Sequence, residues 1–262
     1  MIFSNASCLL AQDTPGARAI GLGGSAIVLD DVWSGFHNQA GLVYLKGLSA
    51  GVFYENRFSL NELATRGAIV ALPFGNNAFS LSYKSFGYSA FSNSKASLAY
   101  ALKMSEKFSG GIQINYHSFR IGENYGTQQT VSFEGGFQYK MTSKLTLGAH
   151  IYNPTRAKIA DFNDERIASV LRAGAGYKFS EKLQLLGEVR KASDSDAGLR
   201  LGIEYWPVEQ IAVRGGFGSE PSMYSFGFGW KLKTFQVDAA ASFHQVLGFS
   251  PQLSLTYNGS KK

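Results

Sequence analysis

The 262-residue chain has four histidines and a single cysteine, the residue types that most often bind zinc, and cysteine is also a strong nucleophile. The H-E-x-x-H pattern of zinc hydrolases and the G-x-S-x-G motif of serine hydrolases do not occur in the chain. A lone cysteine excludes an internal disulfide and a cysteine-rich metal site. We therefore predict no catalytic residue, no metal site and no cofactor, in a protein that is not an enzyme. The five residues are His37, His117, His150, His244 and Cys8.

A larger set of charged residues alternates with apolar residues through the second half of the chain, and we call this set the charge ladder. Alternation places its members on one face of successive strands. Buried charges need partners, so we expect ion pairs across strands, for example Glu188 with Arg200. Two roles stay open: charges that only neutralise each other, or a polar wall that docks an inner segment or guides a solute. The ladder comprises Glu134, Arg172, Glu188, Arg190, Arg200, Glu204, Arg214 and Asp238.

Short β-strands are the elements that must position these side chains. From about residue 47 to the end, segments of roughly ten residues alternate apolar and polar positions and end at turn signals, which is typical of a transmembrane β-barrel. No run of about 18 apolar residues occurs, which excludes a membrane-spanning helix. We predict an all-β, antiparallel transmembrane barrel whose fourteen strands cover residues 47–56, 64–74, 77–87, 95–104, 108–120, 128–141, 145–153, 168–179, 183–192, 197–207, 210–218, 222–232, 235–246 and 250–258.

Alternation within the strands separates a lipid face from a lumen face. In segment 197–207, Leu199 and Leu201 flank Arg200. Lipid must lie on the apolar side, because a charged side chain facing the bilayer midplane costs about 2–4 kcal/mol. The charge ladder and every histidine except His37 then face the lumen. A soluble β-sandwich or a lipocalin-like barrel is the alternative, but a soluble barrel of fourteen strands would enclose more space than side chains can fill.

The connections between segments fall into two classes. Short turns come at every second junction, and four of them share a Lys-apolar-polar-Lys pattern. Outer-membrane barrels have short periplasmic turns and longer outer loops, so we expect both termini in the periplasm of a Gram-negative bacterium. The longest connection, about 154–168, is the candidate outer-loop contact for a partner. Its charged residues are Arg156, Lys158, Asp161, Asp164, Glu165 and Arg166.

Composition bears on location and partners. A content of 14% aromatic and only 17% charged residues fits a chain that exposes apolar surface to outer-membrane lipid. The formal charge of +6 comes with no dense Lys/Arg block, so scattered turn lysines explain it better than a nucleic-acid site does. Residues 1–12 resemble the end of a signal peptide, although a charged n-region is missing. Lipidation of Cys8 is a weaker alternative, because the residues before it make a poor lipobox.

Residues 13–46 do not follow the strand alternation. They contain Gly16-Ala17-Arg18-Ala19-Ile20-Gly21-Leu22-Gly23-Gly24, then Asp30-Asp31, and then Asn38-Gln39-Ala40-Gly41-Leu42. These motifs resemble the N-terminal hatch of the FadL-like outer-membrane superfamily, and most of all its PorV/PorQ-type branch from Bacteroidetes. That branch usually has proline where this chain has Gln39. The resemblance implies that residues 13–46 plug the lumen of a barrel formed by residues 47–262. The hatch motif residues are Gly21, Gly23, Gly24, Asp30, Asp31, Asn38, Gln39, Ala40 and Gly41.

The resemblance also implies two functions. The PorV/PorQ-type branch implies a non-catalytic subunit or accessory of an outer-membrane secretion or assembly complex, as in type IX secretion, with a larger outer-membrane protein complex as partner. FadL itself implies transport of small hydrophobic or amphiphilic solutes. A structural barrel without cargo is a third possibility. Short outer loops argue against a large ligand site, so the sequence favours the first function and keeps transport as the alternative.

Overall fold

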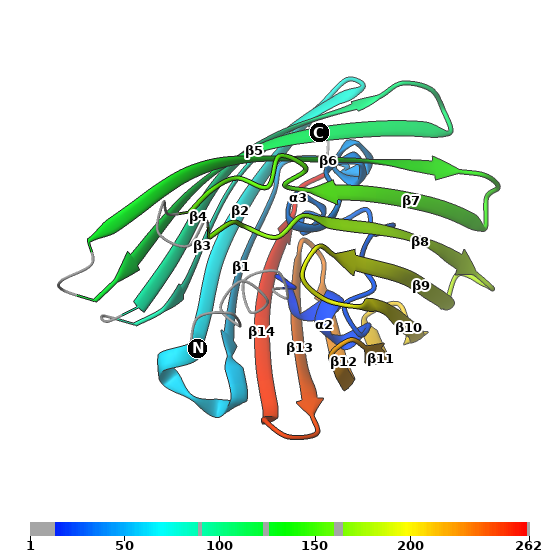
Figure 1. The fold of residues 1–262 in the computed structure, drawn as a ribbon. Coiled ribbons are helices and arrows are strands. Elements are labelled where there is room, and N and C mark those ends of the chain that lie inside the picture. The colour runs from blue at the N-terminus through cyan, green and yellow to red at the C-terminus, as the bar shows by residue number, and fades with distance from the viewer. Residues whose placement is uncertain (1–13, 89–90, 123–125, 160–164, 261–262) are drawn as a thin grey trace.

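The computed structural model describes residues 14–88, 91–122, 126–159 and 165–260. Across these ranges, fourteen antiparallel strands pair in sequence order, and β1 pairs with β14 to close the barrel (Figure 1). The fourteen-strand barrel expected from the sequence is thereby confirmed. The strands are β1 Ser49–Asn56, β2 Ala64–Phe74, β3 Asn77–Gly87, β4 Phe91–Lys103, β5 Phe108–Ile121, β6 Thr127–Lys140, β7 Leu145–Tyr152, β8 Val170–Lys178, β9 Leu183–Ala192, β10 Ala197–Val208, β11 Ile211–Ser219, β12 Ser222–Leu232, β13 Phe235–His244 and β14 Gly248–Asn258.

Period-two alternation is the reason that these segments form a two-faced wall. In β10, Leu201 and Ile203 are each 44% exposed on the outer face, whereas the intervening Gly202 and the next residue, Glu204, are buried toward the lumen. Glu204 lies opposite Arg214 of β11 in the register. The outside of the barrel is therefore apolar and suited to lipid, while polar side chains meet inside.

The largest difference from the predicted strand limits is at β4, which begins at Phe91 rather than at residue 95. Ser92, Asn93 and Ser94 continue its pairing with β3 and β5. All three side chains are polar, so the apolar–polar signal is absent there although the backbone ladder continues. Pairing, rather than hydropathy, extends this strand.

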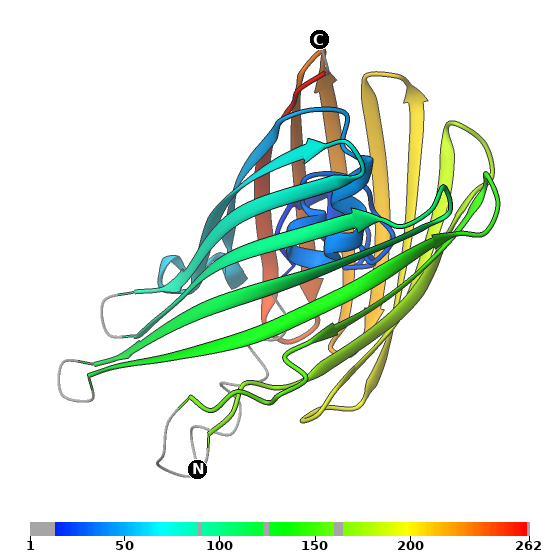
Figure 2. The ribbon, with the colours of Figure 1, turned by 90° about the horizontal axis from the view of Figure 1, so that it is seen from above.

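Residues 14–46, which we call the hatch segment, lie inside the barrel (Figure 2). The segment forms two short helices, α2 (Ala17–Gly21) and α3 (Ser34–His37), and a 3-10 helix, η1 (Gln39–Tyr44). Helix α2 packs against β11 to β14, and η1 packs against β2 to β6. No helix among the described residues is long and apolar enough to span a bilayer.

An apolar cluster joins the hatch segment to the first four strands. Val32, Trp33, Phe36 and Leu42 of the hatch segment are buried against inward residues of β1 to β4. The Trp33 ring meets the Phe53 ring edge-on at 5.8 Å between centroids. Small inward side chains leave room for these large residues. We call this contact the apolar seat. Its wall residues are Phe53, Ile69, Ala71, Ala78, Ala99 and Ala101.

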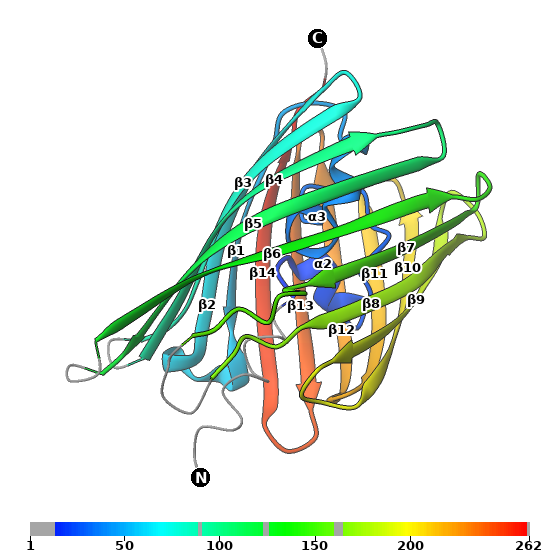
Figure 3. The same ribbon diagram turned by 45° about the horizontal axis from the view of Figure 1, so that its top comes forward.

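The barrel has two unlike rims (Figure 3). One rim, which we call the short-turn rim, carries the connections from β2 to β3, β4 to β5, β6 to β7, β8 to β9, β10 to β11 and β12 to β13. Strand β14 ends at this rim, with Asn258 paired to Ser49. The opposite rim carries the longer connections, including the 3-10 helices η2 (Arg57–Ser59) and η3 (Asn61–Leu63). We call it the long-loop rim.

Candidate functional site

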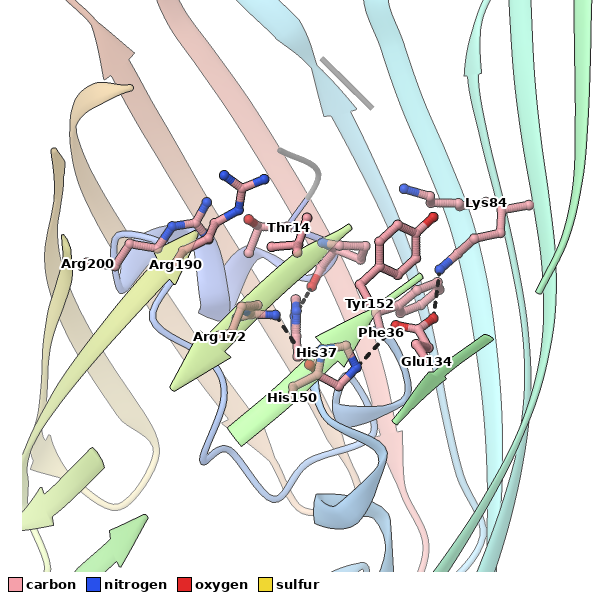
Figure 4. A pocket seen from close by; sticks show the side chains of 13 residues that line it. Thr14, Phe36, His37, Lys84, Glu134, His150, Tyr152, Arg172, Arg190 and Arg200 are labelled. Atoms are coloured by element: carbon pink, nitrogen blue, oxygen red, sulfur yellow. Dashed lines mark hydrogen bonds and ion pairs between the residues drawn. The ribbon is translucent and has the colours of Figure 1, made fainter. Parts of the chain in front are cut away.

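The main candidate site is a polar cavity of about 60 Å³ between the hatch segment and the strand ends near the long-loop rim. A cavity of this size holds several water molecules or one small polar group. We call it the outer pocket. Figure 4 shows its side chains converging from the hatch segment and from six strands, β3, β4 and β6 to β9, with Arg200 joining from β10. The lining residues are Thr14, Pro15, Phe36, His37, Lys84, Lys95, Glu134, His150, Tyr152, Val170, Arg172, Arg190 and Arg200.

Positive charge dominates the outer pocket. Among the described lining residues, five side chains are cationic and only Glu134 is acidic. Burial lowers the effective dielectric constant, so these charges act more strongly than they would at the surface. This field would stabilise an anionic group that enters the pocket, whereas it would repel a cationic group. The cationic residues are Lys84, Lys95, Arg172, Arg190 and Arg200.

One wall of the pocket is tied to the hatch segment through Arg172. Its Nε and Nη2 donate to the two carboxylate oxygens of Glu188 at 2.6 and 2.8 Å. Its Nη1 donates to the backbone carbonyl of His37 at 3.2 Å. Nearby, Arg200 donates to the Gly24 carbonyl at 3.1 Å. These two arginines therefore border the pocket and hold the hatch segment at the same time.

The opposite wall is organised by Glu134. Lys95 Nζ lies 3.3 Å from Glu134 Oε1, and His150 Nε2 lies 3.2 Å from Glu134 Oε2. Gln113 donates to the same carboxylate. The Lys95 ammonium also faces the Tyr152 ring at 5.4 Å from its centroid. Glu134 thus compensates Lys95, as Glu188 compensates Arg172 on the other wall. With Glu188 counted, the described cations around the pocket still outnumber the acids by five to two.

The hatch segment contributes His37 to the floor of the outer pocket. Burial, followed by the nearby Arg172 cation, lowers the pKa of His37 to about 3. The neutral ring meets the Pro15 carbonyl at 2.8 Å through Nε2, which donates its proton there. His37 therefore adds no charge to the pocket near neutral pH.

Below the pocket, the charge ladder forms an ionic seat for α2. Arg18 donates to both carboxylate oxygens of Glu204, at 2.9 and 2.7 Å, and to Asp31 at 2.9 Å. Arg214 donates to Glu204 and to Asp238, each at 2.7 Å. A chain of five alternating charges thus runs from the hatch segment into β10, β11 and β13.

A second anchor lies at Glu188. The Oε2 atom of this carboxylate accepts hydrogen bonds from the backbone amides of Ala26 and Ile27, both at 3.2 Å. Glu188 and Arg200 are register partners, as expected, but the carboxylate takes its side-chain bonds from Arg172. The ladder residue Arg190 lines the outer pocket instead. Neutralising and docking roles therefore coincide in this part of the wall.

The glycines of the hatch motif lie where the chain presses against the wall. Gly23 has a φ of +67°, and a Cβ there would lie 2.6 Å from the Phe217 amide nitrogen. Gly24 also has positive φ. A Cβ on Gly21 would lie 3.0 Å from the Gly227 Cα atom. Gly23 in particular combines a left-handed backbone with a close approach that only glycine allows.

The remaining hatch motif residues close the segment on itself. Asn38 donates to the carbonyls of Ile27 and Phe137, at 2.9 and 3.1 Å. Its side-chain oxygen accepts from the Ala40 amide. A Cβ on Gly41 would lie 2.4 Å from the Leu29 carbonyl oxygen. Gln39 is fully buried, Asp31 pairs with Arg18, and Asp30 is exposed in a cavity beneath the hatch segment.

The four described candidate outer-loop residues, Arg156, Lys158, Glu165 and Arg166, are not among the residues that line the outer pocket. Lys158 and Arg166 form an isolated antiparallel bridge, and Arg166 donates to the Arg156 carbonyl at 3.3 Å. Glu165 supplies a backbone carbonyl to the same small hairpin. Asp161 and Asp164 lie outside the described residues, as does the expected signal-peptide segment 1–12.

Sequence reasoning missed three contributors to the site: Arg18, Lys84 and Lys95. Lys84 could have been found, because it shares the polar face of its strand with Ser80 and Ser82. Lys95 stood at the edge of a predicted strand, where alternation had no upstream residues to support it. The pairing of Arg18 with Glu204 joins residues that are 186 positions apart, so no local pattern indicates it.

The histidines do not come together. His150 and His37 line the outer pocket, His117 bonds to Ser132, and His244 lies near the long-loop rim. Within the described ranges, no three His, Cys, Asp or Glu side chains are grouped as metal ligands would be. The described side chains of the site offer charge and hydrogen bonds.

Comparisons with known proteins place the fold. No protein-family model matches the sequence, and no curated protein matches it significantly. The chain is similar in structure to the CymD monoaromatic hydrocarbon channel, with a TM-score of 0.73, 13% identity, and 94% of this chain and 98% of that chain covered. It is also similar to the Ralstonia pickettii toluene transporter TbuX, with a TM-score of 0.68, 11% identity and 92% and 96% covered.

A third similar structure is a Pseudomonas aeruginosa FadL homologue, with a TM-score of 0.66, 14% identity, and 94% of this chain and 98% of that chain covered. At these identities, the likeness concerns the fold. The barrel is therefore of the type found in FadL-like outer-membrane channels. These comparisons give no support to the PorV/PorQ-type branch in particular.

Proposed function

We propose that this chain is an outer-membrane channel that takes up small amphiphilic solutes carrying a negative charge. The outer pocket is the observation that carries this proposal. Among its described lining residues, five side chains are cationic and one is acidic, and Glu188 compensates one of the five, Arg172. The hatch segment supplies part of the lining. The likeness to channels described as hydrocarbon and toluene transporters supports uptake. The charge of the pocket favours solutes with an anionic head over neutral hydrocarbons.

The orientation in the membrane is part of the proposal. Long connections face outward and short turns face the periplasm in barrels of this class. The outer pocket then opens toward the cell exterior, where a solute would arrive. Strand β14 ends at the short-turn rim and so would end in the periplasm.

A binding experiment on the detergent-solubilised protein tests the pocket. Phenylacetate and its neutral amide, phenylacetamide, have nearly the same size and differ in charge. Titration calorimetry should show at least tenfold tighter binding of the carboxylate, which corresponds to about 1.4 kcal/mol. Lys84→Gln with Arg190→Gln should remove that preference, because two of the five positive charges are then lost.

Lys191→Gln is the matched control, since Lys191 is adjacent in sequence to Arg190 and exposed outside the lumen. This variant should keep the preference for the carboxylate. If the double variant does not fold, Lys84→Gln alone serves as the test variant, because Lys84 is only partly buried. Equal affinity of the wild-type protein for both compounds would contradict the proposal.

A role as accessory subunit of a larger outer-membrane complex, of the PorV/PorQ type in type IX secretion, is the second candidate. The observation that favours it is an apolar depression of about 320 Å³ on the outer face of β9 to β11. It is bordered by Leu185, Leu201, Ile203 and Phe217 around Gly215. Purification from native outer membranes in mild detergent should then yield a stoichiometric larger barrel. A lone monomer would count against this role.

A further inference from the structure

Lysines at the short-turn rim are concentrated there rather than scattered along the chain. Among the described residues in or directly beside the short turns and the start of β1, nine are lysine and three are glutamate. The excess of positive charge equals the formal net charge of the whole chain, +6. The lysines are Lys46, Lys103, Lys107, Lys140, Lys144, Lys178, Lys182, Lys231 and Lys233, and the acids are Glu106, Glu181 and Glu209.

The long-loop rim differs in charge. Its described residues carry bases and acids in similar number, so it has little net charge. The bases are Arg57, Arg120, Arg156, Lys158, Arg166 and Lys191, and the acids are Glu62, Glu165, Asp194, Asp196 and Glu220. The lysines lie in or beside turns, as expected, and among the described residues the turns that carry them are at one end of the barrel.

Lys103 bonds to Glu106 of its own turn at 2.9 Å, but other lysines are not needed to close the turns in which they lie. In three turns a hydroxyl accepts the backbone amides that close the turn: Ser105, Thr142 and Ser180. The exposed Lys107, Lys144 and Lys182 follow those residues and contribute only their backbone to this geometry. Repulsion among like charges also opposes such a ring. A turn of this type would form equally well with neutral residues in place of the lysines.

Aromatic side chains on the outer face fix the depth of this rim. Tyr177 and Phe179 meet edge-on at 4.8 Å, and Phe235 lies 5.5 Å from Tyr257. Trp230 is 49% exposed on the same face. Aromatic residues at strand ends lie at the level of lipid headgroups. Lys140 and Lys178 line a cavity next to the hatch segment. The exposed Lys107, Lys144, Lys182 and Lys233 come immediately beyond the aromatic residues, at the level of the headgroup phosphates, which flexible ammonium chains can reach.

From this arrangement we infer that the short-turn rim binds anionic phospholipid headgroups of the leaflet that surrounds it. Lysines lie at four of the six short turns and before β1, on several sides of the barrel. This distribution suits several lipids better than a protein partner, which would contact one sector. The binding would hold the barrel at a fixed depth. It does not depend on what the lumen transports.

Native mass spectrometry of the delipidated protein, titrated with palmitoyl-oleoyl phosphatidylglycerol or phosphatidylcholine, tests this inference. The wild-type protein should retain several phosphatidylglycerol molecules and bind them roughly tenfold more tightly than phosphatidylcholine. The test variant replaces Lys107, Lys144, Lys182 and Lys233 with glutamine and should lose most of that preference. Its heat-modifiable gel migration should stay that of a folded barrel, because all four lysines are exposed.

The matched control removes the same charge from exposed residues elsewhere: Arg66, Arg120, Arg156 and Lys191 to glutamine. It should retain the preference for phosphatidylglycerol. An equal loss in both variants, or a wild-type protein without preference, would overturn the inference. Binding of poly-L-glutamate that depends on the short-turn lysines, with lipid binding unchanged, would overturn it too and would indicate an acidic protein partner instead.

Discussion

The two sides of the lumen hold the hatch segment by different forces. On the side of β1 to β4, Trp33 and Leu42 pack among small and apolar wall residues. On the side of β8 to β13, Arg18 of the hatch segment forms a short ion pair with Glu204, and Glu188 accepts hydrogen bonds from two backbone amides of the same segment. We call the two contacts the apolar seat and the ionic seat. The outer pocket adjoins the ionic side, where Arg172 and Arg200 serve both.

Because the two seats depend on different forces, they should respond differently to a charged solute. Apolar contacts have no preferred direction and change little when an ion arrives. Ion pairs are directional, and a removed partner leaves a buried charge uncompensated. An anionic solute in the outer pocket would compete for arginines that also hold the hatch segment. The ionic seat is thus the side on which a solute could loosen the hatch segment, while the apolar seat keeps it attached.

Removing both seats at once should have the largest effect. Deletion of residues 14–46 removes the segment that lies inside the barrel, so if this segment closes the lumen, single-channel conductance in planar bilayers should rise from near zero to that of an open pore. Purified barrel with normal heat-modifiable migration is the control for folding. Unchanged conductance would mean that the hatch segment does not close the channel.

Disrupting the ionic seat alone should have the second-largest effect. Glu204→Gln leaves Arg18 and Arg214 without their shared carboxylate, and loss of one partner in such a buried network costs about 3–5 kcal/mol. Amide hydrogen exchange should speed up in α2, while β1 to β4 are unaffected. Glu209→Gln, at an exposed turn, is the control and should leave exchange in α2 as it was.

Breaking the apolar seat should cost somewhat less and act elsewhere. Leu42 is fully buried, and Leu42→Ala should destabilise the docked hatch segment by about 2–4 kcal/mol. Faster exchange should appear in η1, with α2 still protected by Arg18. Equal loss of protection in α2 and η1 would show that the two seats act as one unit.

Acidification should weaken docking through His37. Its pKa is about 3 when docked and 6.5 when exposed, so the undocked segment binds the proton first. Docking is then unaffected above pH 6.5 and loses stability as pH falls below it, by about 2 kcal/mol at pH 5. Burial raises the pKa of Asp31, so proton binding by Asp31 favours the docked state and opposes the effect of His37 once the pH falls through that raised pKa.

The measurement is hatch-segment exchange, corrected for its intrinsic pH dependence, between pH 7 and 5. His37→Gln should abolish the change with pH. Constant exchange in the wild-type protein over that range would contradict this prediction. It would mean that the pKa of His37 is the same in the docked and the undocked segment.

The smallest expected effect concerns the departure from the hatch motif. Gln39 is the first residue of η1 and follows Asn38, whose backbone is extended with φ −160° and ψ 102°. Proline is favoured at the first position of a helix and after an extended residue. Gln39→Pro should therefore stabilise the docked segment by about 0.4–1 kcal/mol, seen as slower exchange in η1. Faster exchange would indicate that the buried Gln39 side chain matters more than backbone rigidity.

The barrel could be predicted from the sequence because its signal is local and repeated. The alternation within each strand indicates which of its faces meets lipid and which meets the lumen. In β10, for example, Leu201 is exposed on the outer face and Glu204 is buried toward the lumen. The strand limits agree closely except where polar residues such as Asn93 carry the pairing beyond the apolar region. The same logic found which charges point inward.

The partners of those charges could not be predicted. Alternation places Glu204 and Arg214 on one face, but the bond from Arg18 depends on how a separate segment folds inside the barrel. The register alone suggested an ion pair between Glu188 and Arg200. In the structure, the Arg172 guanidinium instead donates to both carboxylate oxygens of Glu188. The outer pocket likewise combines residues from seven strands and the hatch segment, so no contiguous motif describes it.

Uptake into proteoliposomes tests the central proposal most directly. Vesicles containing the wild-type protein should take up labelled phenylacetate in a saturable manner and faster than phenylacetamide, relative to protein-free vesicles. Lys84→Gln with Arg190→Gln should lose this selectivity, and Lys191→Gln should retain it. Equal rates for the two compounds, or faster passage of the amide, would contradict a channel whose outer pocket selects anionic amphiphiles.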